Sequence, residues 1–244
     1  MTTFGTPRRH IAQCGSTNDL AREWARDPDD PAPSGALVTA NFQTRGRGQR
    51  GRQWQAGWGQ SALMSFVYRL TPAVEAGQLG LVTALAAMDG LNSAAALSPR
   101  LKWPNDVLLD GRKVAGILVE ISPPAPAKPD SGGAILGIGI NVNQERFFGA
   151  EEFVYPPTSL HLATGKSHQV ERVISAVAQA LMKWEEAWRR DGFAPILDEC
   201  RDRLALGAAV RQGGLTGELI GLTPTGAAQV RLLGGTFEEW RTVD

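Results

Sequence analysis

Cysteine and histidine are scarce in this sequence of 244 residues. The two cysteines, Cys14 and Cys200, lie far apart, and the three histidines, at positions 10, 161 and 168, form no ligand-like pair. Neither a disulfide framework nor a zinc site of closely spaced ligands fits this pattern. We therefore expect reduced thiols in a cytoplasmic protein.

Long apolar runs and a charge excess of either sign are also missing. No apolar stretch approaches bilayer-spanning length, and residues 1–10 lack the apolar core of a signal peptide, so we expect no membrane partner. Basic and acidic residues both number 25, whereas a dedicated nucleic-acid binder usually has a broad basic excess. With 43% hydrophobic residues, the chain suits one large domain, alone or with a small appendage.

The most informative segment is a run of arginines and glycines at residues 43–54. Four arginines alternate with three glycines, directly after an apolar, strand-like run at residues 36–40. Glycine lets the backbone come close to a ligand, and arginine supplies planar, permanently charged donors. The pattern favours a site for a small anion. The alternative is a basic loop that is merely solvated or that contacts nucleic acid.

Alternation and helical spacing along the rest of the chain predict an α+β protein. The expected elements are a short helix capped at Ser16, strands over residues 36–43, 62–70, 101–106, 113–121 and 134–142, and helices over residues 75–97, 170–188 and 195–204. From residue 207 onward, short strands separated by glycine-rich turns predict a small antiparallel β-barrel. The pattern therefore places a domain boundary near residue 206.

Three further segments carry polar groups suited to chemistry. Asn105 and Asp106 end a short strand, where they suit either Mg²⁺ and an incoming amine or a plain turn with a salt bridge. Lys113 begins an apolar strand, from which it either reaches water or neutralises an anion over the sheet. Residues 134–142 place Gly137, Gly139 and Asn141 on one face, which favours close approach by a ligand or a neighbouring backbone.

The order and spacing of these segments resemble the biotin protein ligases. That family carries Ser-Thr-Asn, Gln-Thr-x-Gly-Arg-Gly-Arg-x-Gly-Arg-x-Trp, Lys-Trp-Pro-Asn-Asp, Lys-x-Ala-Gly-Ile-Leu-x-Glu and Gly-x-Gly-Ile-Asn. All five segments have counterparts between residues 16 and 143, and the arginine segment and Lys-Trp-Pro-Asn-Asp are the specific ones. The resemblance implies a catalytic domain of mixed β-sheet flanked by helices over residues 1–206, and it covers the small barrel at 207–244 more loosely.

The resemblance implies a ligase that uses ATP. Family members join biotin to ATP, giving biotinyl-5′-AMP and pyrophosphate, and then pass the biotinyl group to one lysine of a biotin carboxyl carrier domain. The carrier belongs to a biotin-dependent carboxylase. Relatives also form homodimers through sheet edges. Only fifteen residues precede Ser16, too few for the DNA-binding domain of regulatory members, so we expect the form of the family that binds no DNA.

The resemblance also assigns roles to individual residues. The biotin-binding set is Ser16, Thr17, Asn18, Gln43, Arg47, Gly48, Gln49, Lys113 and Gly116. The ATP-binding set is Arg50, Arg52, Trp54, Lys113 and Asn141. The catalytic set is Lys113, Asp106, Arg47, Arg50 and Arg52, and the Mg²⁺ ligands are Asn105 and Asp106. Lys113 would contact the biotin carboxylate and the α-phosphate, and Asp106 would accept the proton of the incoming lysine.

One position departs from the family pattern, because Gln49 stands where relatives usually carry an arginine that helps to retain the adenylate. Weaker retention is the hypothesis that follows. Three other functions compete with the ligase: a lipoate–protein ligase-like acyltransferase, a weak or inactive biotin- or adenylate-binding module, and a nucleic-acid binder. The arginine segment and Lys-Trp-Pro-Asn-Asp argue against the first, and Lys113, Asp106 and Arg52 argue against the second. Zero net charge disfavours the third.

Overall fold

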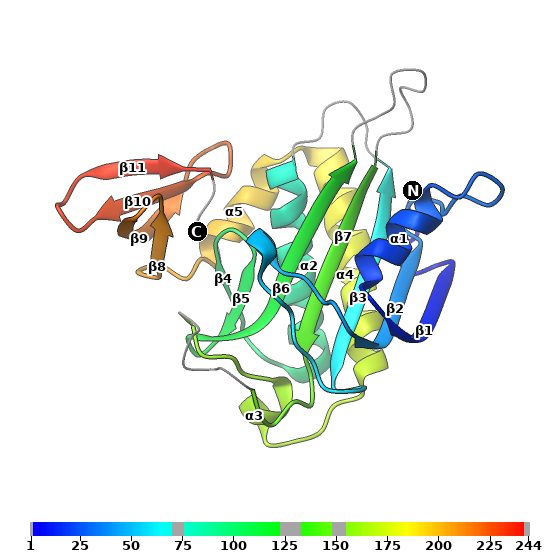
Figure 1. Ribbon diagram of the computed structural model, residues 1–244. Helices are drawn as coiled ribbons and strands as arrows, with labels where there is room; N and C mark the ends of the chain where they lie inside the picture. Colours follow the sequence, from blue (N-terminus) through cyan, green and yellow to red (C-terminus); the bar gives the residue numbers. More distant parts are fainter. Residues whose placement is uncertain (1, 70–75, 123–132, 148–154, 242–244) are drawn as a thin grey trace.

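The computed structural model describes residues 2–69, 76–122, 133–147 and 155–241. Two sheets lie side by side in it (Figure 1): a large mixed sheet with helices on both faces, and a small antiparallel sheet near the C-terminus. The α+β prediction is confirmed. None of the helices within these ranges combines the length and the apolar character that crossing a membrane requires.

The large sheet has seven strands in the order β1-β2-β3-β7-β6-β5-β4. Their bounds are β1 Arg8–Cys14, β2 Leu37–Gln43, β3 Ser61–Arg69, β4 Arg100–Lys102, β5 Asp106–Leu109, β6 Arg112–Ser122 and β7 Gly133–Asn141. Only β1 and β2 pair in parallel. They are joined through α1 (Thr17–Ala25), because a parallel pair needs a crossover connection. All other neighbouring strands pair in antiparallel fashion. The sheet thereby places segments that are distant in the sequence next to each other.

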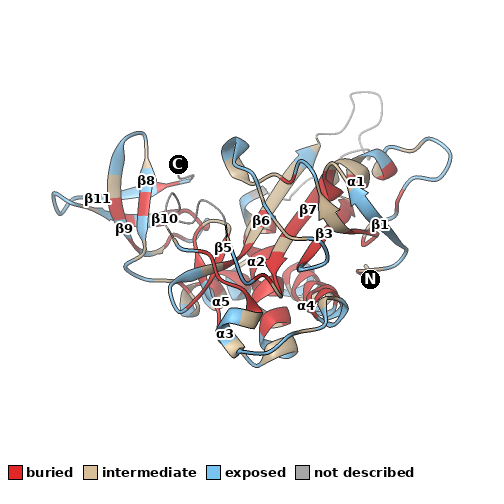
Figure 2. Cartoon of the chain, turned by 60° about the horizontal axis from the view of Figure 1, so that its bottom comes forward, coloured by how far each residue is buried: buried red, intermediate tan, exposed pale blue. Residues whose placement is uncertain are grey.

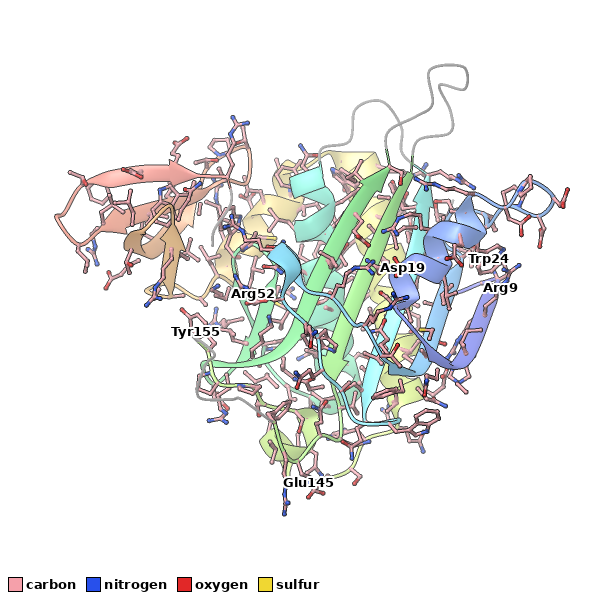
Figure 3. All side chains as sticks on the ribbon, in the orientation of Figure 1. Arg9, Asp19, Trp24, Arg52, Glu145 and Tyr155 are labelled. Carbon is pink, nitrogen blue, oxygen red and sulfur yellow. The ribbon has the colours of Figure 1, made fainter. Side chains whose placement is uncertain are left out.

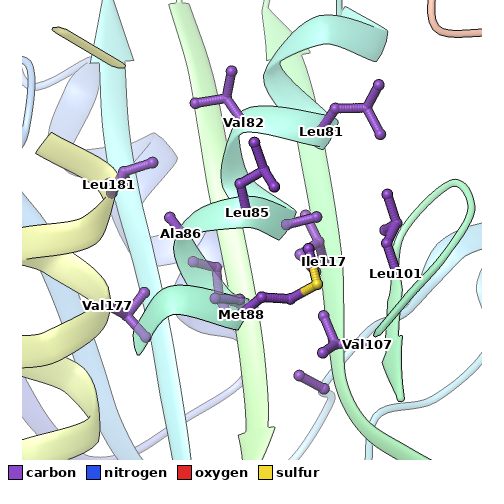
Figure 4. Close-up of a cluster of buried hydrophobic side chains, with 14 of the residues drawn as sticks. Leu81, Val82, Leu85, Ala86, Met88, Leu101, Val107, Ile117, Val177 and Leu181 are labelled. Carbon is purple, nitrogen blue, oxygen red and sulfur yellow. The ribbon is translucent and has the colours of Figure 1, made fainter. Parts of the chain in front are cut away.

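Helices α2 (Ala76–Ala95) and α4 (Val170–Asp191) pack together against one face of this sheet. In Figure 4, Leu85 and Met88 of α2 point toward Ile117 of β6, and Val177 of α4 lies against α2. All four side chains are buried. Figure 2 shows buried residues, in red, on α2, α4 and the central strands of the large sheet. The opposite face of the sheet carries a smaller apolar cluster under α1 and the polar groups that line the cleft.

Three local predictions need correction. The predicted strand over residues 101–106 is wrong as one element, because the chain turns at residues 103–105, between β4 and β5. The edge strand β1 was not predicted, since its mostly exposed side chains show no apolar alternation. Ser16 does occupy the N-cap of α1 but makes no side-chain cap hydrogen bond. Between β5 and β6 the chain turns at Asp110 and Gly111, and both residues have positive φ, at 48° and 74°.

The C-terminal strands form an open sheet in the order β11-β10-β9-β8. The strands are β8 Ala209–Gln212, β9 Leu215–Leu222, β10 Ala228–Leu232 and β11 Phe237–Trp240. The predicted barrel is therefore not closed, because four short strands cannot complete a cylinder. Helices α3 (Leu160–Thr164) and α5 (Ala194–Asp202) complete the described fold. The domain boundary at residue 206 stays a prediction.

The small sheet is tied to the large one by Trp103. This side chain is buried, and its indole Nε1 donates a hydrogen bond of 2.9 Å to the carbonyl of Gly226, in the turn between β9 and β10. Trp103 sits in the turn between β4 and β5, which also carries Asn105. The C-terminal sheet thereby supports a turn that the sequence marks as functional.

Candidate functional site

A cleft of about 820 Å³ lies on the sheet face opposite α2 and α4. It brings together residues from all five sequence segments. The predicted site residues that line it are Ser16, Thr17, Asn18, Gln43, Arg47, Gly48, Gln49, Arg52, Trp54, Asn105, Asp106, Lys113, Gly116 and Asn141. Arg50 is the one predicted site residue that does not line this cleft as described. Segments as far apart in the chain as Ser16 and Asn141 thus meet in one cavity.

The arginine-rich segment forms a tongue, residues 46–54, that crosses in front of β6 and β7 (Figure 1). Its two legs pair with each other: the amide of Gly48 donates to the carbonyl of Arg52 at 2.7 Å, and the amide of Trp54 donates to the carbonyl of Gly46 at 3.0 Å. Arg50 turns the tip with a φ of 57°. The tongue therefore has a defined fold of its own, built on backbone bonds between its legs.

The glycine face of β7 makes room for two side chains. A Cβ added to Gly139 would lie 2.6 Å from the ring of Trp54, and one added to Gly137 would lie 2.3 Å from the carboxamide of Asn18. Gly116 of β6 lies beside the same indole, at 3.0 Å for an added Cβ. The prediction was close approach by a ligand or by a neighbouring backbone. The groups that lie against these glycines are instead side chains from the tongue and from α1.

One end of the cleft is lined by a network of neutral polar groups. Both the amide and the hydroxyl of Thr17 donate to Oε1 of Gln43, at 2.7 and 2.9 Å. The hydroxyl of Ser65 donates to Thr17 Oγ1 at 2.8 Å and also contacts Asn18. Ser65 is fully buried on β3 and carries no motif, so sequence reasoning missed it. These bonds fix the positions of Thr17 and Gln43, so that end of the cleft is held by the protein's own contacts.

Four charged groups surround this polar network. Arg47 of the tongue makes two hydrogen bonds of 2.7 Å to the carboxylate of Asp19 on α1. Arg22 reaches both Asp19, at 2.9 Å, and Glu120 of β6, at 2.7 Å. Asn18 Nδ2 donates to Glu120 at 2.6 Å. The hydrogen bond from Arg47 is the main cause that lowers the pKa of Asp19. The same bond raises the pKa of Arg47. Asp19, Arg22 and Glu120 were not predicted as site residues.

The other end of the cleft gathers two lysines around one carboxylate. Asp106 is buried, and its carboxylate lies 2.6 Å from Lys113 Nζ and 3.8 Å from Lys102 Nζ. The pKa of Lys102 is lowered, chiefly by burial. The charge of Asp106 raises this pKa, and the charges of Lys113 and Arg52 lower it further. Tyr155 covers Lys102 with its ring at 5.2 Å. In Figure 3, Arg52 and Tyr155 lie on this side of the cleft, and Asp19 lies on the other.

Two buried atoms beside the cleft have neither a hydrogen bond nor an ion pair within the described residues, whereas Oδ1 of Asp106, which also lacks a hydrogen bond, is paired with Lys113. The two atoms are Nε1 of Trp54, a donor, and Oδ1 of Asn141, an acceptor. Asn141 is held by its other amide atom, since Nδ2 donates to the carbonyl of Thr158 at 2.9 Å. A buried polar atom without a partner is costly, so both atoms suit a ligand that completes their bonding.

Asn105 and Asp106 do not form a magnesium site as they stand. Asn105 Nδ2 donates to the carbonyl of Ile117 at 3.0 Å, and Asp106 is engaged by Lys113 and Lys102. No cluster of three or more His, Cys, Asp or Glu residues suited to a metal occurs in the described part of the chain. Mg²⁺ prefers oxygen ligands in near-octahedral geometry. Two ammonium groups on the one carboxylate oppose that arrangement.

The fold and the cleft define the class of protein. The biotin protein ligase from Aquifex aeolicus in complex with biotin and ATP has the same fold, with a TM-score of 0.81 and 28% identity, over 97% of this chain and 96% of that one. The model of the biotin/lipoate A/B protein ligase family matches residues 11–141, and the chain belongs to that family.

Two curated relatives are similar to this chain in sequence. The biotin–[acetyl-CoA-carboxylase] ligase of Paracoccus denitrificans is 39% identical over 190 residues, which cover 76% of each protein. The bifunctional ligase/repressor BirA of Bacillus spizizenii is 37% identical over 183 residues, 74% of this chain and 54% of that protein. The chain thus spans about half the length of the BirA relatives that it matches.

Proposed function

We propose that this chain is an ATP-dependent biotin protein ligase. It activates biotin to biotinyl-5′-AMP and transfers the biotinyl group to one lysine of a biotin carboxyl carrier domain. The observation that carries the proposal is the single cleft in which all five motifs meet, polar at one end and positively charged at the other. Its relatives are named as biotin ligases, which supports the same assignment.

Biotin would occupy the polar end of the cleft. A ureido ring offers N–H donors and a carbonyl acceptor, and Ser16, Thr17, Asn18 and Gln43 present complementary groups there. Gly48 and Gln49 of the tongue and Gly116 of β6 would enclose the remainder of the molecule. Buried polar groups of this kind reject an acid that leaves them unpaired, which separates biotin from lipoate.

The adenylation step would take place at the charged end. One carboxylate oxygen of biotin bonds to the α-phosphorus of ATP while the bond to the pyrophosphate oxygen breaks. Both reactants are anions, so positive charge and positioning supply most of the rate. Lys113 would bridge the carboxylate and the α-phosphate, and Arg52, with Arg50 after movement of the tongue tip, would neutralise the leaving pyrophosphate. Lys102 lines the same end and adds to this charge.

The nucleotide would complete the bonding of the two unpartnered buried atoms. Trp54 Nε1 is available as a donor and Asn141 Oδ1 as an acceptor. Magnesium would arrive with the triphosphate, since Mg²⁺ in such sites is bound largely by substrate phosphates and water. Coordination by Asn105 and Asp106 would require Lys113 to leave the carboxylate for the phosphates.

In the second step the carrier lysine bonds to the acyl carbon of biotin, AMP leaves, and the amine loses a proton. A free lysine is mostly protonated at neutral pH, so a nearby carboxylate is needed as acceptor. Asp106 is the candidate, because it lies in the cleft beside Lys113. Once Lys113 engages the phosphate, this carboxylate becomes available to the incoming ammonium group.

Exchange of labelled pyrophosphate into ATP tests the proposal. Wild type should catalyse exchange that requires biotin and does not respond to lipoate. Lys113→Ala should reduce the exchange rate by about 100- to 1000-fold, the effect of removing one donor to a developing charge. Lys183→Ala, a largely exposed lysine on α4, is the matched control and should exchange like wild type.

Absence of exchange with either acid, from folded protein that still binds biotin, would favour the binding-module alternative. Exchange that requires lipoate would favour the acyltransferase alternative. The homodimer, the lack of DNA binding and the cytoplasmic location stay predictions. Sedimentation at the assay concentration tests the first of them.

A further inference from the structure

The four charged groups Asp19, Arg22, Arg47 and Glu120 form a cluster, here called the latch, at the polar end of the cleft. It joins three separate elements: Asp19 and Arg22 come from α1, Glu120 from β6, and Arg47 from the tongue. Two acids and two bases balance in charge. The latch therefore provides no net charge for an anionic ligand, and its function has to be sought in what it holds in place.

The tongue is attached to the body of the protein at the base of each leg. Trp54, on the second leg, rests on the glycine floor formed by Gly116 and Gly139. Arg47, on the first leg, is held by Asp19 through two bonds of 2.7 Å, with Glu120 at 3.6 Å. The backbone bonds described above join the legs to each other, but not to α1. Release of Arg47 would leave the first leg without its ion pair to α1.

We infer that Asp19 is a positioning residue that holds the tongue closed over the cleft through its paired hydrogen bonds to Arg47. The inference rests on the proposed function and deepens it, because a closed tongue encloses both the acid and the adenylate. It also changes the part played by Arg47. Its guanidinium is held by a protein carboxylate, so its contribution to catalysis is to carry the tongue.

The geometry makes Asp19 the central member of the latch. A guanidinium bound to a carboxylate through two parallel bonds is directional as well as charged. Asp19 is the only latch acid that Arg47 contacts at hydrogen-bond distance, since Glu120 lies 3.6 Å away. Arg22 braces Asp19 from α1, and the pKa shifts of Asp19 and Arg47 agree with this pairing. Replacing Asp19 by the isosteric asparagine removes the charge and one acceptor and leaves the fold of α1 in place.

Limited digestion with trypsin measures tongue opening directly. The tongue contains cleavable arginines, and a protease cuts such a segment in proportion to how often it opens. Asp19→Asn should increase the rate of cleavage after Arg50 by on the order of tenfold, the loss expected for one charge-assisted hydrogen bond. Saturating biotin should slow cleavage of wild type more than that of the variant.

Ligand retention is the second readout. Asp19→Asn should raise the KM for biotin and the rate of adenylate release by on the order of tenfold, with kcat for pyrophosphate exchange changed less than about threefold. The matched control is Asp89→Asn, which removes another partly buried carboxylate paired with an arginine, Arg203, but far from the cleft. It should leave tongue cleavage and adenylate release as in wild type. Arg47→Lys, which keeps the charge and loses the paired geometry, should fall between wild type and Asp19→Asn.

A rate of cleavage after Arg50 that is unchanged in Asp19→Asn would overturn the inference. So would an increase in cleavage and adenylate release in Asp89→Asn as large as that in Asp19→Asn. If Asp19→Asn fails to fold, Arg47→Lys replaces it in both measurements. Rates of cleavage and adenylate release equal to wild type in Arg47→Lys would then overturn the inference. Failure of the proposed function is distinct from either result. It would be seen as wild-type protein without biotin-dependent exchange, whereas the digestion needs no activity.

Discussion

The two ends of the cleft differ in how their charges are balanced. At the polar end, Asp19 and Glu120 face Arg22 and Arg47, one acid for each base, at distances of hydrogen bonds. At the other end, Lys102 and Lys113 share the single carboxylate of Asp106, and Arg52 lines the same cavity. A balanced cluster stabilises one arrangement of the chain. An unbalanced one stabilises an anion that is not part of the chain.

The pKa shifts reflect this contrast. At the polar end the partners favour the charged forms, and the pKa of Asp19 is lowered chiefly by its bond to Arg47. At the lysine end burial and neighbouring cations disfavour a charge, and the pKa of Lys102 is lowered. Burying a cation beside other cations is unfavourable for folding. In the proposed function, a phosphate group that enters the cleft would offset this cost.

After Lys113→Ala, the largest effect is expected where the tongue meets the floor between the two ends. Gly139→Ala places a Cβ 2.6 Å from the ring of Trp54, so the ring and the second leg of the tongue must shift. Overpacking of this kind costs about 1–3 kcal/mol. We expect kcat/KM for ATP to fall by roughly 10- to 100-fold, because Trp54 no longer rests on β7.

Steady-state kinetics with ATP as the varied substrate measures this effect. Gly80→Ala is the control, since a Cβ there meets no other atom, and its kinetics should match wild type. Wild-type kinetics for Gly139→Ala would mean that the position of Trp54 has no bearing on the nucleotide.

A smaller effect is expected from Lys102→Met, which should raise the stability of the fold and lower the affinity for ATP. This change leaves Asp106 and Lys113 as a balanced pair. Because the pKa of Lys102 is lowered in the folded chain, the cost of burying its charge is fully present below that lowered pKa. The cost decreases as pH rises from there to 10.5, the ordinary value of a lysine, and is absent above it. The variant should therefore be more stable at pH 7 by about 1 kcal/mol, and the gain should vanish above pH 10.5.

Urea unfolding at pH 7 and at pH 11 measures the stability difference, and ATP titration measures the loss of affinity. A variant that is less stable at pH 7, or a gain that persists at high pH, would contradict the account of an unbalanced charge. Affinity for ATP should fall by roughly tenfold, as for one lost charged contact.

The smallest effect is expected from Gln49→Arg at the tip of the tongue. Gln49 is the position that departs from the family pattern, and it lines the cleft. An added guanidinium should slow release of the adenylate by a few-fold, since an exposed charged contact contributes about 0.2–1 kcal/mol. Filter-binding release of labelled intermediate checks this, and equal release from both proteins would remove Gln49 as a cause of weak retention.

Part of this site could be predicted from the order of residues alone. Sequence segments with special chemistry stay intact when the chain folds, so Lys113, Asp106, Trp54 and Asn141 were predicted as parts of one site and line one cleft. Buried alternation and helical spacing likewise predicted the strands and helices of the core. These features depend on neighbours within a few positions along the chain.

The pairings across the cleft were decided by tertiary structure. Asp19 and Arg47 lie 28 positions apart, and Asn18 and Glu120 lie 102 apart, so no local pattern joins them. The same holds for Ser65 under Thr17 and for the exposed edge strand β1, which is a strand because it pairs with β2. Residue types and their spacing determined which chemistry this chain can perform. The sheet, by bringing distant segments to one face, decided which charges are balanced within the protein and which remain for a ligand.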